Sequence, residues 1–400
     1  YGGGEPSAIY YILGITEHIC GVDNVQSLCN LALMTGNLGV EGGGINPMRG
    51  QNNIQGAGDC GAVPANFPGF QPCHDPANAE KFSKLYGTEI DAEKGITKIA
   101  ALNLCGAEKD GIHAMLIDGE NTVVTDPDKH HCEHALKSLE HLVVIDLFLT
   151  ETAELADVVF PATGYAETDG VQANTERRVQ RLRAAVPPPG EAKPDWWIIS
   201  QIAQRMGTPN FEFESAKDVF NELCSLSPIY AGLDWDRIDK GEYQWPVPDK
   251  DHPGTPRLHE EEFKNGRGLF KIIGYRDPAE VIDDEYPIWL TTGRRLQSYH
   301  TRTQTGRSQG IDYLLNEESL EIHPADAEAW GIKDGDFVKM ASRRGEIQIK
   351  VRITDRSPKG TVFTSFSFAS VPVNELTGSG YDPVTDTAEL KVCPVKVAKV

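Results

Sequence analysis

The alternation of short apolar runs with helical patterns is the feature that most constrains how this chain can fold. Apolar runs of strand length cover residues 8–13, 113–118, 142–146 and 156–163. Helical patterns lie between them, at residues 23–34, 128–140 and 150–156. Strands that alternate with helices form a parallel sheet, and ligands bind beyond the carboxyl ends of its strands. The predicted fold class is therefore α/β, with parallel-sheet domains suited to a nucleotide.

Polar side chains follow two of these predicted strands. Asn121 and Thr125 come after the run at 113–118, and Asp146 and Phe148 close the run at 142–146. A carboxylate in such a place can accept a hydrogen bond from a ribose hydroxyl or a base N–H. It can equally well cap a helix or a turn, and the sequence leaves both interpretations open.

Residues 48–56 (MRGQNNIQG) form a very polar segment after the glycine run at 42–44. The segment contains one Arg, four side-chain amides and two Gly. A guanidinium group matches a carboxylate through two parallel hydrogen bonds. We therefore expect a loop in which Arg49, with Gln51 beside it, binds a polar ligand such as a carboxylate. The alternative is a surface turn with a solvated Arg.

The second half of the chain changes character twice. Residues 164–192 are polar and end in a proline run, and helical patterns follow at 195–206 and 216–225. Residues 226–268 are expected to form loops, and so are residues 57–80 in the first half of the chain. From about residue 286 the sequence holds short β-type runs at 288–292, 337–341, 346–353 and 361–366, with a helix expected at 324–330. This pattern predicts a compact C-terminal β-barrel.

Composition narrows the classes of partner. A net charge of −21 argues against nucleic acid and against an anionic membrane surface, because both need clustered Lys and Arg. No apolar run approaches the roughly 20 residues of a membrane span. The eight Cys are scattered without a C-x-x-C pair, so we expect neither a disulfide scaffold nor a zinc or iron–sulfur site, and a reducing, cytoplasmic location.

The cluster His130-His131-Cys132-Glu133-His134 offers metal-ligand side chains with an i, i+4 pair of His. It lacks the H-E-x-x-H order of a helical zinc site and directly follows Pro127 and Asp128. We therefore expect the exposed first turns of a helix, and no residue of this chain is predicted to bind a metal.

Four patterns together resemble the molybdopterin oxidoreductase superfamily, and within it the catalytic (alpha) subunits of formate dehydrogenases. They are T-G-N-L-G with G-x-N-P-x-R-G-Q-N-N-x-Q-G at 35–56, D-x-F with A-D-V-V-x-P-A-T at 143–163, T-T-G-R with Y-H-T-R-T and T-G-R at 291–307, and I-H-P-x-D-A with D-G-D-x-V and S-R-R-G at 322–345. The last three mark the superfamily, and the R-G-Q-N-N-x-Q-G loop points to formate dehydrogenase.

The resemblance implies a molybdenum or tungsten centre held by two pyranopterin guanine dinucleotides (bis-molybdopterin guanine dinucleotide). Formate would give up a hydride there and leave as carbon dioxide, reversibly, and the electrons would pass to iron–sulfur clusters. Arg49 matches the family residue that binds the formate carboxylate, and Gln51 lies next to it.

Further positions match family residues that line the dinucleotides. They are Gly14, Thr16, Gly119, Asn121, Thr125, Asp146, Phe148 and Asp195, and, in the C-terminal cap, Thr292, Arg294, Tyr299, His300, Asn374 and Lys391. Two positions depart from the family: Ser298 stands where many relatives have His, and Ser367 interrupts an aromatic-His-aromatic pattern. None of the eight Cys matches the Cys or selenocysteine that binds the metal.

We therefore expect the C-terminal part of such a subunit, divided into residues 1–51 (the end of an α/β domain with the Arg loop), 52–163 (an α/β dinucleotide-binding domain), 164–283 (an excursion of helices and loops) and 284–400 (a double-psi β-barrel). The expected partners are the missing N-terminal part with a 4Fe-4S cluster, and iron–sulfur or flavin electron-transfer subunits. Three alternatives stay open: a formylmethanofuran dehydrogenase, a nitrate reductase, and a non-catalytic scaffold subunit without a pterin.

Overall fold

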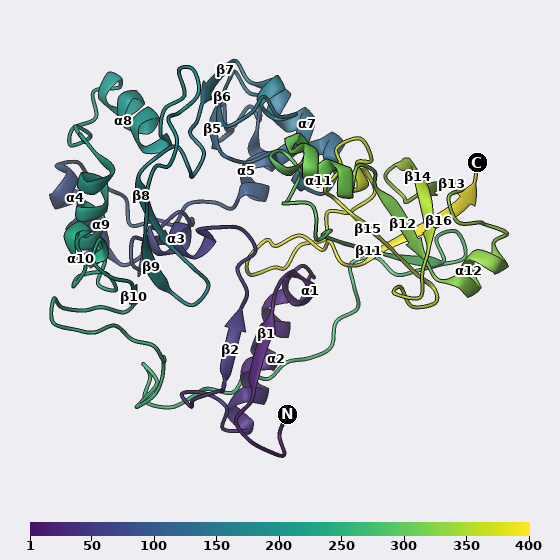
Figure 1. The fold of residues 1–400 in the computed structure, drawn as a ribbon, viewed down its shortest axis with the longest axis horizontal. Helices are drawn as coiled ribbons and strands as arrows, with labels where there is room; N and C mark the ends of the chain where they lie inside the picture. The colour runs from purple at the N-terminus through teal and green to yellow at the C-terminus, as the bar shows by residue number, and fades with distance from the viewer. The chain divides into compact units, whose positions relative to one another are not determined.

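A computed structural model describes residues 1–400, and the chain divides into two compact units, each built from three stretches (Figure 1). Unit 1 comprises residues 1–12, 29–98 and 160–270, and unit 2 comprises residues 13–28, 99–159 and 271–400. The chain therefore passes from one unit to the other several times. The division into four consecutive segments that the sequence suggests stays a prediction.

In unit 1, a pair of parallel strands supports the polar loop at 48–56. Strand β1 (Ala8–Tyr11) pairs in parallel with β2 (Gly44–Pro47), and helix α2 (Gly21–Met34) runs between them in the sequence. Helix α2 stops before Gly36, whose φ of 68° suits a residue without a side chain. The loop then leaves the end of β2 and enters the short helix α3 (Ile54–Asp59).

The rest of unit 1 packs helices against a small antiparallel sheet. Strands β8 (Gly170–Ala173), β9 (Arg178–Leu182) and β10 (Tyr243–Gln244) form this sheet in the order β10-β9-β8. Its core holds mainly aromatic and aliphatic side chains, namely Ala173, Val179, Phe220, Cys224, Tyr230, Leu233, Ile238, Trp245 and Val247. The helices of this unit are α4 (Pro76–Tyr86), α8 (Asp195–Arg205), α9 (Ala216–Leu226) and α10 (Trp235–Ile238), and β3 (Asn66–Phe67) and β4 (Gln71–Pro72) form a minimal hairpin.

In unit 2, an α/β layer presents the strand ends that the sequence predicts. Strands β5 (Ala114–Asp118) and β6 (His141–Asp146) pair in parallel, and β7 (Val158–Pro161) lies on the other side of β6. The accompanying helical segments are α1 (Leu13–Thr16), α5 (Lys98–Leu104), α6 (Thr122–Thr125), α7 (Lys129–Lys137) and the 3-10 turn η1 (Ala153–Leu155). Leu136, Leu142 and Val144 are buried between the helices and the sheet.

The C-terminal part of unit 2 is a closed six-stranded barrel in the order β11-β15-β12-β14-β13-β16. Its strands are β11 (Ile288–Gly293), β12 (Ser319–Ile322), β13 (Phe337–Ala341), β14 (Glu346–Ile353), β15 (Thr361–Ser365) and β16 (Cys393–Lys399). Alternate residues of β14 point inward, as expected for a strand with one buried face. Short helical segments lie between the strands: η2 (Thr305–Arg307), α11 (Gln309–Leu314), α12 (Pro324–Ala329) and η3 (Val373–Glu375).

The predicted α/β class with a C-terminal barrel is confirmed, while several local predictions are wrong. Residues 60–75 are mostly turns and loops, as predicted for the stretch 57–80, but the end of that stretch belongs to helix α4. Asp75 caps this helix through the Ala77 N–H and Pro76 occupies its first turn. The polar segment at 164–192 contains the antiparallel pair of strands β8 and β9. Their many polar and charged residues obscure the alternation of apolar and polar side chains by which a strand is recognised in a sequence. Strands β12 and β16 were missed. None of the helices is both long and apolar enough to cross a lipid bilayer.

Candidate functional site

Arg49 stands at the start of the polar loop in unit 1, directly beyond the last pair of β1 and β2. The Met48 N–H donates to the Tyr11 carbonyl at 2.8 Å, which extends the pairing by one residue. The Arg49 N–H donates to the Thr175 hydroxyl at 3.2 Å, and the Arg49 side chain donates through Nε to Gln55 Oε1 at 3.3 Å. The Arg49 residue is exposed, and this bond through Nε leaves its two terminal amino groups available to an anion.

A buried hydrogen-bond chain continues behind Arg49. Gln55 Nε2 donates to Asp59 Oδ1 at 2.8 Å, and the Tyr230 hydroxyl donates to Asp59 Oδ2 at 2.7 Å. Burial raises the pKa of the Asp59 carboxyl, while the hydrogen bonds from Tyr230 and Gln55 and the charge of Arg49 act in the opposite direction. Burial and the adjacent Asp59 also raise the pKa of the Tyr230 phenol.

The turn between Arg49 and Gln55 depends on Asn53 and Gly56. Asn53 has a φ of 61°, which Asn tolerates better than most residues, and its side-chain oxygen accepts from the Ala173 N–H at 3.0 Å. A Cβ on Gly56 would lie 2.1 Å from Asn53 Oδ1, so glycine is required at this position. Gln51 is half-buried within this turn, and its predicted role beside Arg49 stays a prediction.

In unit 2, the predicted strand-end residues lie where the sequence places them. Gly119 follows β5 with a φ of 65° and open space where a side chain would be. Asn121 is buried and uses its amide within the chain, since it donates to Glu151 at 2.7 Å and accepts from the Thr152 hydroxyl at 3.0 Å. Asn121 therefore holds the segment after β6 against the segment after β5.

Asp146 is the last residue of β6, and the Leu147 N–H donates to its carboxylate at 2.6 Å. Burial raises the pKa of Asp146, with Arg307 and the backbone bonds opposing, and burial together with Asp146 raises the pKa of Asp118. The Arg307 guanidinium lies 4.4 Å from the ring centre of Phe148. Strand-end residues and the loop at 291–307 thus meet in one region of unit 2.

Asn374 and Thr125 also meet, through the backbone. The Asn374 amide donates to the carbonyls of Val124 and Thr125 at 2.8 and 3.0 Å, and its oxygen accepts from Thr377 at 3.1 Å. These bonds give Asn374 a positioning task within the fold, and its assignment to the cofactor stays a prediction.

The predicted cap residues gather where β11 ends. The Thr292 hydroxyl donates to the Leu390 carbonyl at 2.7 Å, and Lys391 donates to the Thr292 carbonyl at 3.0 Å and forms an ion pair with Glu17 at 2.7 Å. Burial lowers the pKa of Arg294, against the nearby charge of Glu17. The segment after α1 and the C-terminal cap therefore adjoin within unit 2.

Four buried polar atoms in this cap have no hydrogen-bond partner in the chain. They are Arg294 Nε, Ser298 Oγ, Thr364 Oγ1 and Ser367 Oγ. Thr364 lies in β15, Ser367 follows that strand, and Arg294 and Ser298 follow β11. The two strands pair in parallel with Thr292 opposite Thr364, so both segments leave the barrel at the same end. Buried polar groups are nearly always paired, so these atoms indicate a place for a polar ligand.

The remaining predicted residues fall into both units. Gly14 and Thr16 lie in α1 of unit 2. The Thr16 carbonyl oxygen packs closely against Gly21, where a Cβ would lie 2.2 Å from it. The ring centres of His300 and Phe366 are 5.1 Å apart, and the Tyr299 N–H donates to the Thr305 hydroxyl at 3.1 Å. Asp195 begins α8 in unit 1.

Arg49, Gln51 and Asp195 therefore belong to unit 1, and the other predicted site residues belong to unit 2. The structure brings together the strand-end and cap residues of unit 2, and separately builds the Arg49 loop in unit 1.

Two other clusters carry no site. The His130–His134 segment lies on helix α7, where Cys132 is buried and His131 Nε2 lies 2.9 Å from Asn103 Oδ1. No group of three or more His, Cys, Asp or Glu side chains could hold a metal ion, and the eight Cys are all free thiols. The expected helix is confirmed.

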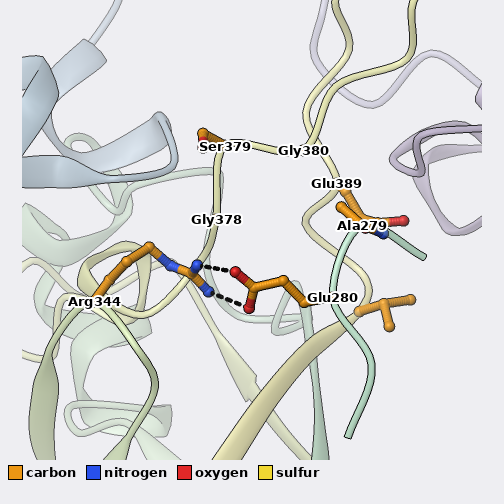
Figure 2. A pocket seen from close by; sticks show the side chains of 8 residues that line it. Ala279, Glu280, Arg344, Gly378, Ser379, Gly380 and Glu389 are labelled. Carbon is orange, nitrogen blue, oxygen red and sulfur yellow. Dashed lines mark hydrogen bonds and ion pairs between the residues drawn. The ribbon is translucent and has the colours of Figure 1, made fainter.

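A hollow in unit 2 is lined by three charged side chains, Arg344, Glu280 and Glu389, that already have partners in the chain. Figure 2 shows the Arg344 guanidinium pairing with both oxygens of Glu280, at 2.5 and 3.1 Å. The carboxylate of Glu389, on the opposite side, accepts from the backbone N–H groups of Ile19 and Ala279. No charge in this hollow is left without compensation.

Sequence reasoning missed Asp59, Tyr230 and Arg307. Asp59 and Tyr230 are 171 residues apart, and no local pattern links them. Arg307 was part of a quoted motif, and its place beside Phe148 follows only from the fold.

Comparison with known proteins identifies the family. The sequence profile of the molybdopterin oxidoreductase family matches residues 5–205, and that of the molydopterin dinucleotide binding domain matches residues 288–394. The chain belongs to the molybdopterin oxidoreductase family. It is 47% identical over 404 residues to the F420-dependent formate dehydrogenase 2 subunit alpha of Methanococcus maripaludis, covering all of this chain and 59% of that protein.

Two further comparisons are at lower sequence identity. Formate dehydrogenase H of Escherichia coli is 37% identical over 407 residues, which are all of this chain and 56% of that protein. The solved structure of acetylene hydratase from Pelobacter acetylenicus aligns with a TM-score of 0.64 at 20% identity, over 82% of this chain and 50% of that one, and shows the shared fold. The chain thus spans well under two thirds of the length of the curated relatives.

The residues present fit a pterin dinucleotide. The unpaired buried donors and acceptors of Arg294, Ser298, Thr364 and Ser367 are of the types that bind pterin ring edges and phosphates. Gly119, with open space at its Cα, allows a ligand to approach the backbone closely. Both features lie in unit 2, at the strand ends and the barrel cap.

Proposed function

We propose that this chain is the part of a formate dehydrogenase catalytic subunit that carries the carboxylate-binding arginine and much of the cofactor cradle. The observation that carries the proposal is the exposed Arg49 guanidinium, held by Nε alone. Relatives named formate dehydrogenase align along the whole chain, at 47% and 37% identity. A guanidinium with two free amino groups is the side chain best suited to a small carboxylate.

In the proposed reaction, Arg49 binds both oxygens of formate and orients its C–H bond. Arg294, Ser298, Thr364 and Ser367 would hold the cofactor, a molybdenum or tungsten bis-molybdopterin guanine dinucleotide, together with the strand-end residues. When bound, that group would supply the acceptor for the hydride of formate, that is, for the two electrons and the proton of its C–H bond. The product carbon dioxide carries no charge, so it loses the ionic attraction to Arg49 and can leave.

We infer that the whole enzyme works with electron-transfer partners in the cytoplasm. Iron–sulfur or flavin subunits would take the electrons, through a 4Fe-4S cluster outside this chain. Three relatives are named F420-dependent formate dehydrogenase subunit alpha, which makes a deazaflavin such as F420 the acceptor to test first.

Nitrate reduction is the second candidate. The assimilatory nitrate reductase catalytic subunit of Bacillus subtilis is 34% identical over 401 residues, covering 97% of this chain and 56% of that protein. Nitrate is also a small planar anion that an Arg can bind. The amide-rich loop at 48–56 favours formate, because this is the pattern that resembles formate dehydrogenases.

The test is turnover of formate and of nitrate by the purified full-length enzyme, with metal analysis of the same sample. We expect formate oxidation, bound Mo or W, and a strong loss of kcat/KM in Arg49→Ala. Turnover of nitrate without turnover of formate would favour the second candidate. A protein with neither metal and no turnover would instead support a scaffold subunit.

A further inference from the structure

The exposed Arg49 is backed by a hydrogen-bond chain that runs into the core of unit 1. Arg49 Nε, the Gln55 amide, the Asp59 carboxylate and the Tyr230 hydroxyl follow one another at 3.3, 2.8 and 2.7 Å. The exposed fraction falls along it, from 8% at Gln55 to 0% at Asp59 and 2% at Tyr230. Gln55 and Asp59 are four residues apart on α3, so they share one face of that helix.

The chain has a fixed direction. An ionised carboxylate only accepts hydrogen bonds, so Asp59 requires the Gln55 amide to turn its NH₂ toward it. The amide oxygen of Gln55 must then face Arg49, whose Nε only donates. A flipped amide would place NH₂ against the guanidinium and oxygen against the carboxylate. Asp59 thus sets the orientation of the group that holds Arg49.

We propose that Gln55, Asp59 and Tyr230 are positioning residues for Arg49. The carboxylate and the tyrosine hold the Gln55 amide in one orientation, and that amide fixes the guanidinium by Nε so that both terminal amino groups point to the substrate carboxylate. The proposal rests on the proposed function and assigns three residues to it beyond the loop itself.

The electrostatic surroundings of Asp59 support a role beyond packing. Its side chain is fully buried, and its two hydrogen-bond donors, Gln55 and Tyr230, are neutral. Arg49 and Arg177 interact with the Asp59 carboxylate through their charges, without a direct bond. The Cys60 thiol belongs to the next residue in the chain. Burying a carboxylate is costly without a directly paired cation, and apolar residues in such places are often no less stable. A residue that only filled this space would not need a charge.

The experiment compares kinetics of the full-length holoenzyme with formate. Gln55→Leu should lower kcat/KM about tenfold, mainly through KM, since one charge-assisted bond that orients Arg49 is lost. Asp59→Leu should do the same without touching Arg49 directly, whereas Asp59→Asn, which can still accept from Gln55, should have a weaker effect. Tyr86→Phe is the matched control, because the Tyr86 hydroxyl donates to Glu222 at 3.1 Å elsewhere in unit 1.

A pH profile separates positioning from simple structural support. Gln55→Glu keeps an oxygen for Arg49 but places a second carboxyl against Asp59, and two such groups retain one proton between them at low pH. Formate KM of this variant should approach the wild-type value at acid pH and rise as the shared proton is lost. If Gln55→Glu only destabilised the fold, the KM for formate would not return toward the wild-type value at acid pH.

The outcomes are distinct. If Gln55→Leu and Asp59→Leu retain cofactor and show the same KM and kcat as Tyr86→Phe, while Arg49→Ala is impaired, the positioning role is wrong and the proposed function stands. If the wild-type enzyme does not oxidise formate, the proposed function is wrong, and the positioning role with it.

Discussion

Replacing Arg49 by Lys tests the proposed carboxylate site most directly, because the change keeps the positive charge and removes the planar guanidinium group. Arg49 uses Nε for Gln55 at 3.3 Å and presents two further amino groups. Lysine has one ammonium group on a flexible stem and no second nitrogen for Gln55. The substitution therefore removes one of the two proposed bonds to the substrate and also leaves the buried Gln55 oxygen without its donor.

The size of the effect follows from these two losses. A hydrogen bond to a charged group contributes about 1.5–3 kcal/mol, so losing one lowers kcat/KM by roughly 10- to 150-fold. The unpaired oxygen of Gln55 adds a cost of about 1–3 kcal/mol, which falls on the native protein and not only on the substrate complex. We expect Arg49→Lys to lie between wild type and Arg49→Ala in kcat/KM.

The assay is steady-state oxidation of formate by the full-length enzyme, normalised to bound metal and pterin. Normalisation matters because a variant that loses cofactor would otherwise look like a variant that binds substrate poorly. A value of kcat/KM within threefold of wild type, at equal cofactor content, would refute the bidentate argument.

Three further predictions concern the loop, the buried carboxylate and the cap. Gly56→Ala should raise the KM for formate, since its Cβ would lie 2.1 Å from Asn53 Oδ1, whereas Gly58→Ala, with open space around it, should not. Because burial raises the pKa of Asp59, the stability it contributes is present below its unfolded pKa of about 4 and is lost as pH rises through the higher folded pKa. The melting temperature of Asp59→Asn should therefore rise relative to that of wild type as pH rises above about 4, through the raised folded pKa of Asp59. Ser367→Ala should lower the amount of pterin bound per enzyme molecule, measured after the denatured protein releases it. The stability of the cofactor-free protein should not fall, because the Ser367 hydroxyl has no hydrogen-bond partner in the chain.

Local sequence patterns sufficed for the parts of the fold that depend on neighbouring residues. The strand ends at Asp118 and Asp146 and the start of α8 at Asp195 fall at or within a residue of their predicted places. Each combines an apolar run or helical period with a polar stop, which are signals carried by adjacent residues. The polar loop at Arg49 was recognisable for the same reason.

The features that could not be predicted from the sequence depend on contacts between residues far apart in the chain. The bond between Tyr230 and Asp59 joins residues far apart in the chain, and neither has a distinctive local setting. Strand β12 (Ser319–Ile322) contains Glu321 and directly follows Glu318, and both Glu residues pair with Arg295, so its burial could not be expected from hydrophobicity. Tertiary partners decide both cases.

The register of β11 and β15 explains why the cap has unpaired polar atoms at all. Leu290 lies opposite Val362 and Thr292 opposite Thr364, and all four side chains are buried. The inner face of this strand pair therefore changes from apolar to polar at its carboxyl end. Because the pairing is parallel, both chains leave the barrel at that end.

A slip of either strand by one residue would turn the threonine of that strand away from the interior and bring its neighbouring side chains inward. Gly293 resists such a slip, since its Cα faces the ring of Phe363 so closely that a Cβ would lie 2.6 Å from it. The aromatic ring and the glycine thus lock the register, and the register delivers Thr364 and the loops after both strands to one place. Gly293→Ala should therefore reduce cofactor retention although Gly293 is not itself a predicted cofactor residue. Full retention in that variant would show that the register is held by other contacts.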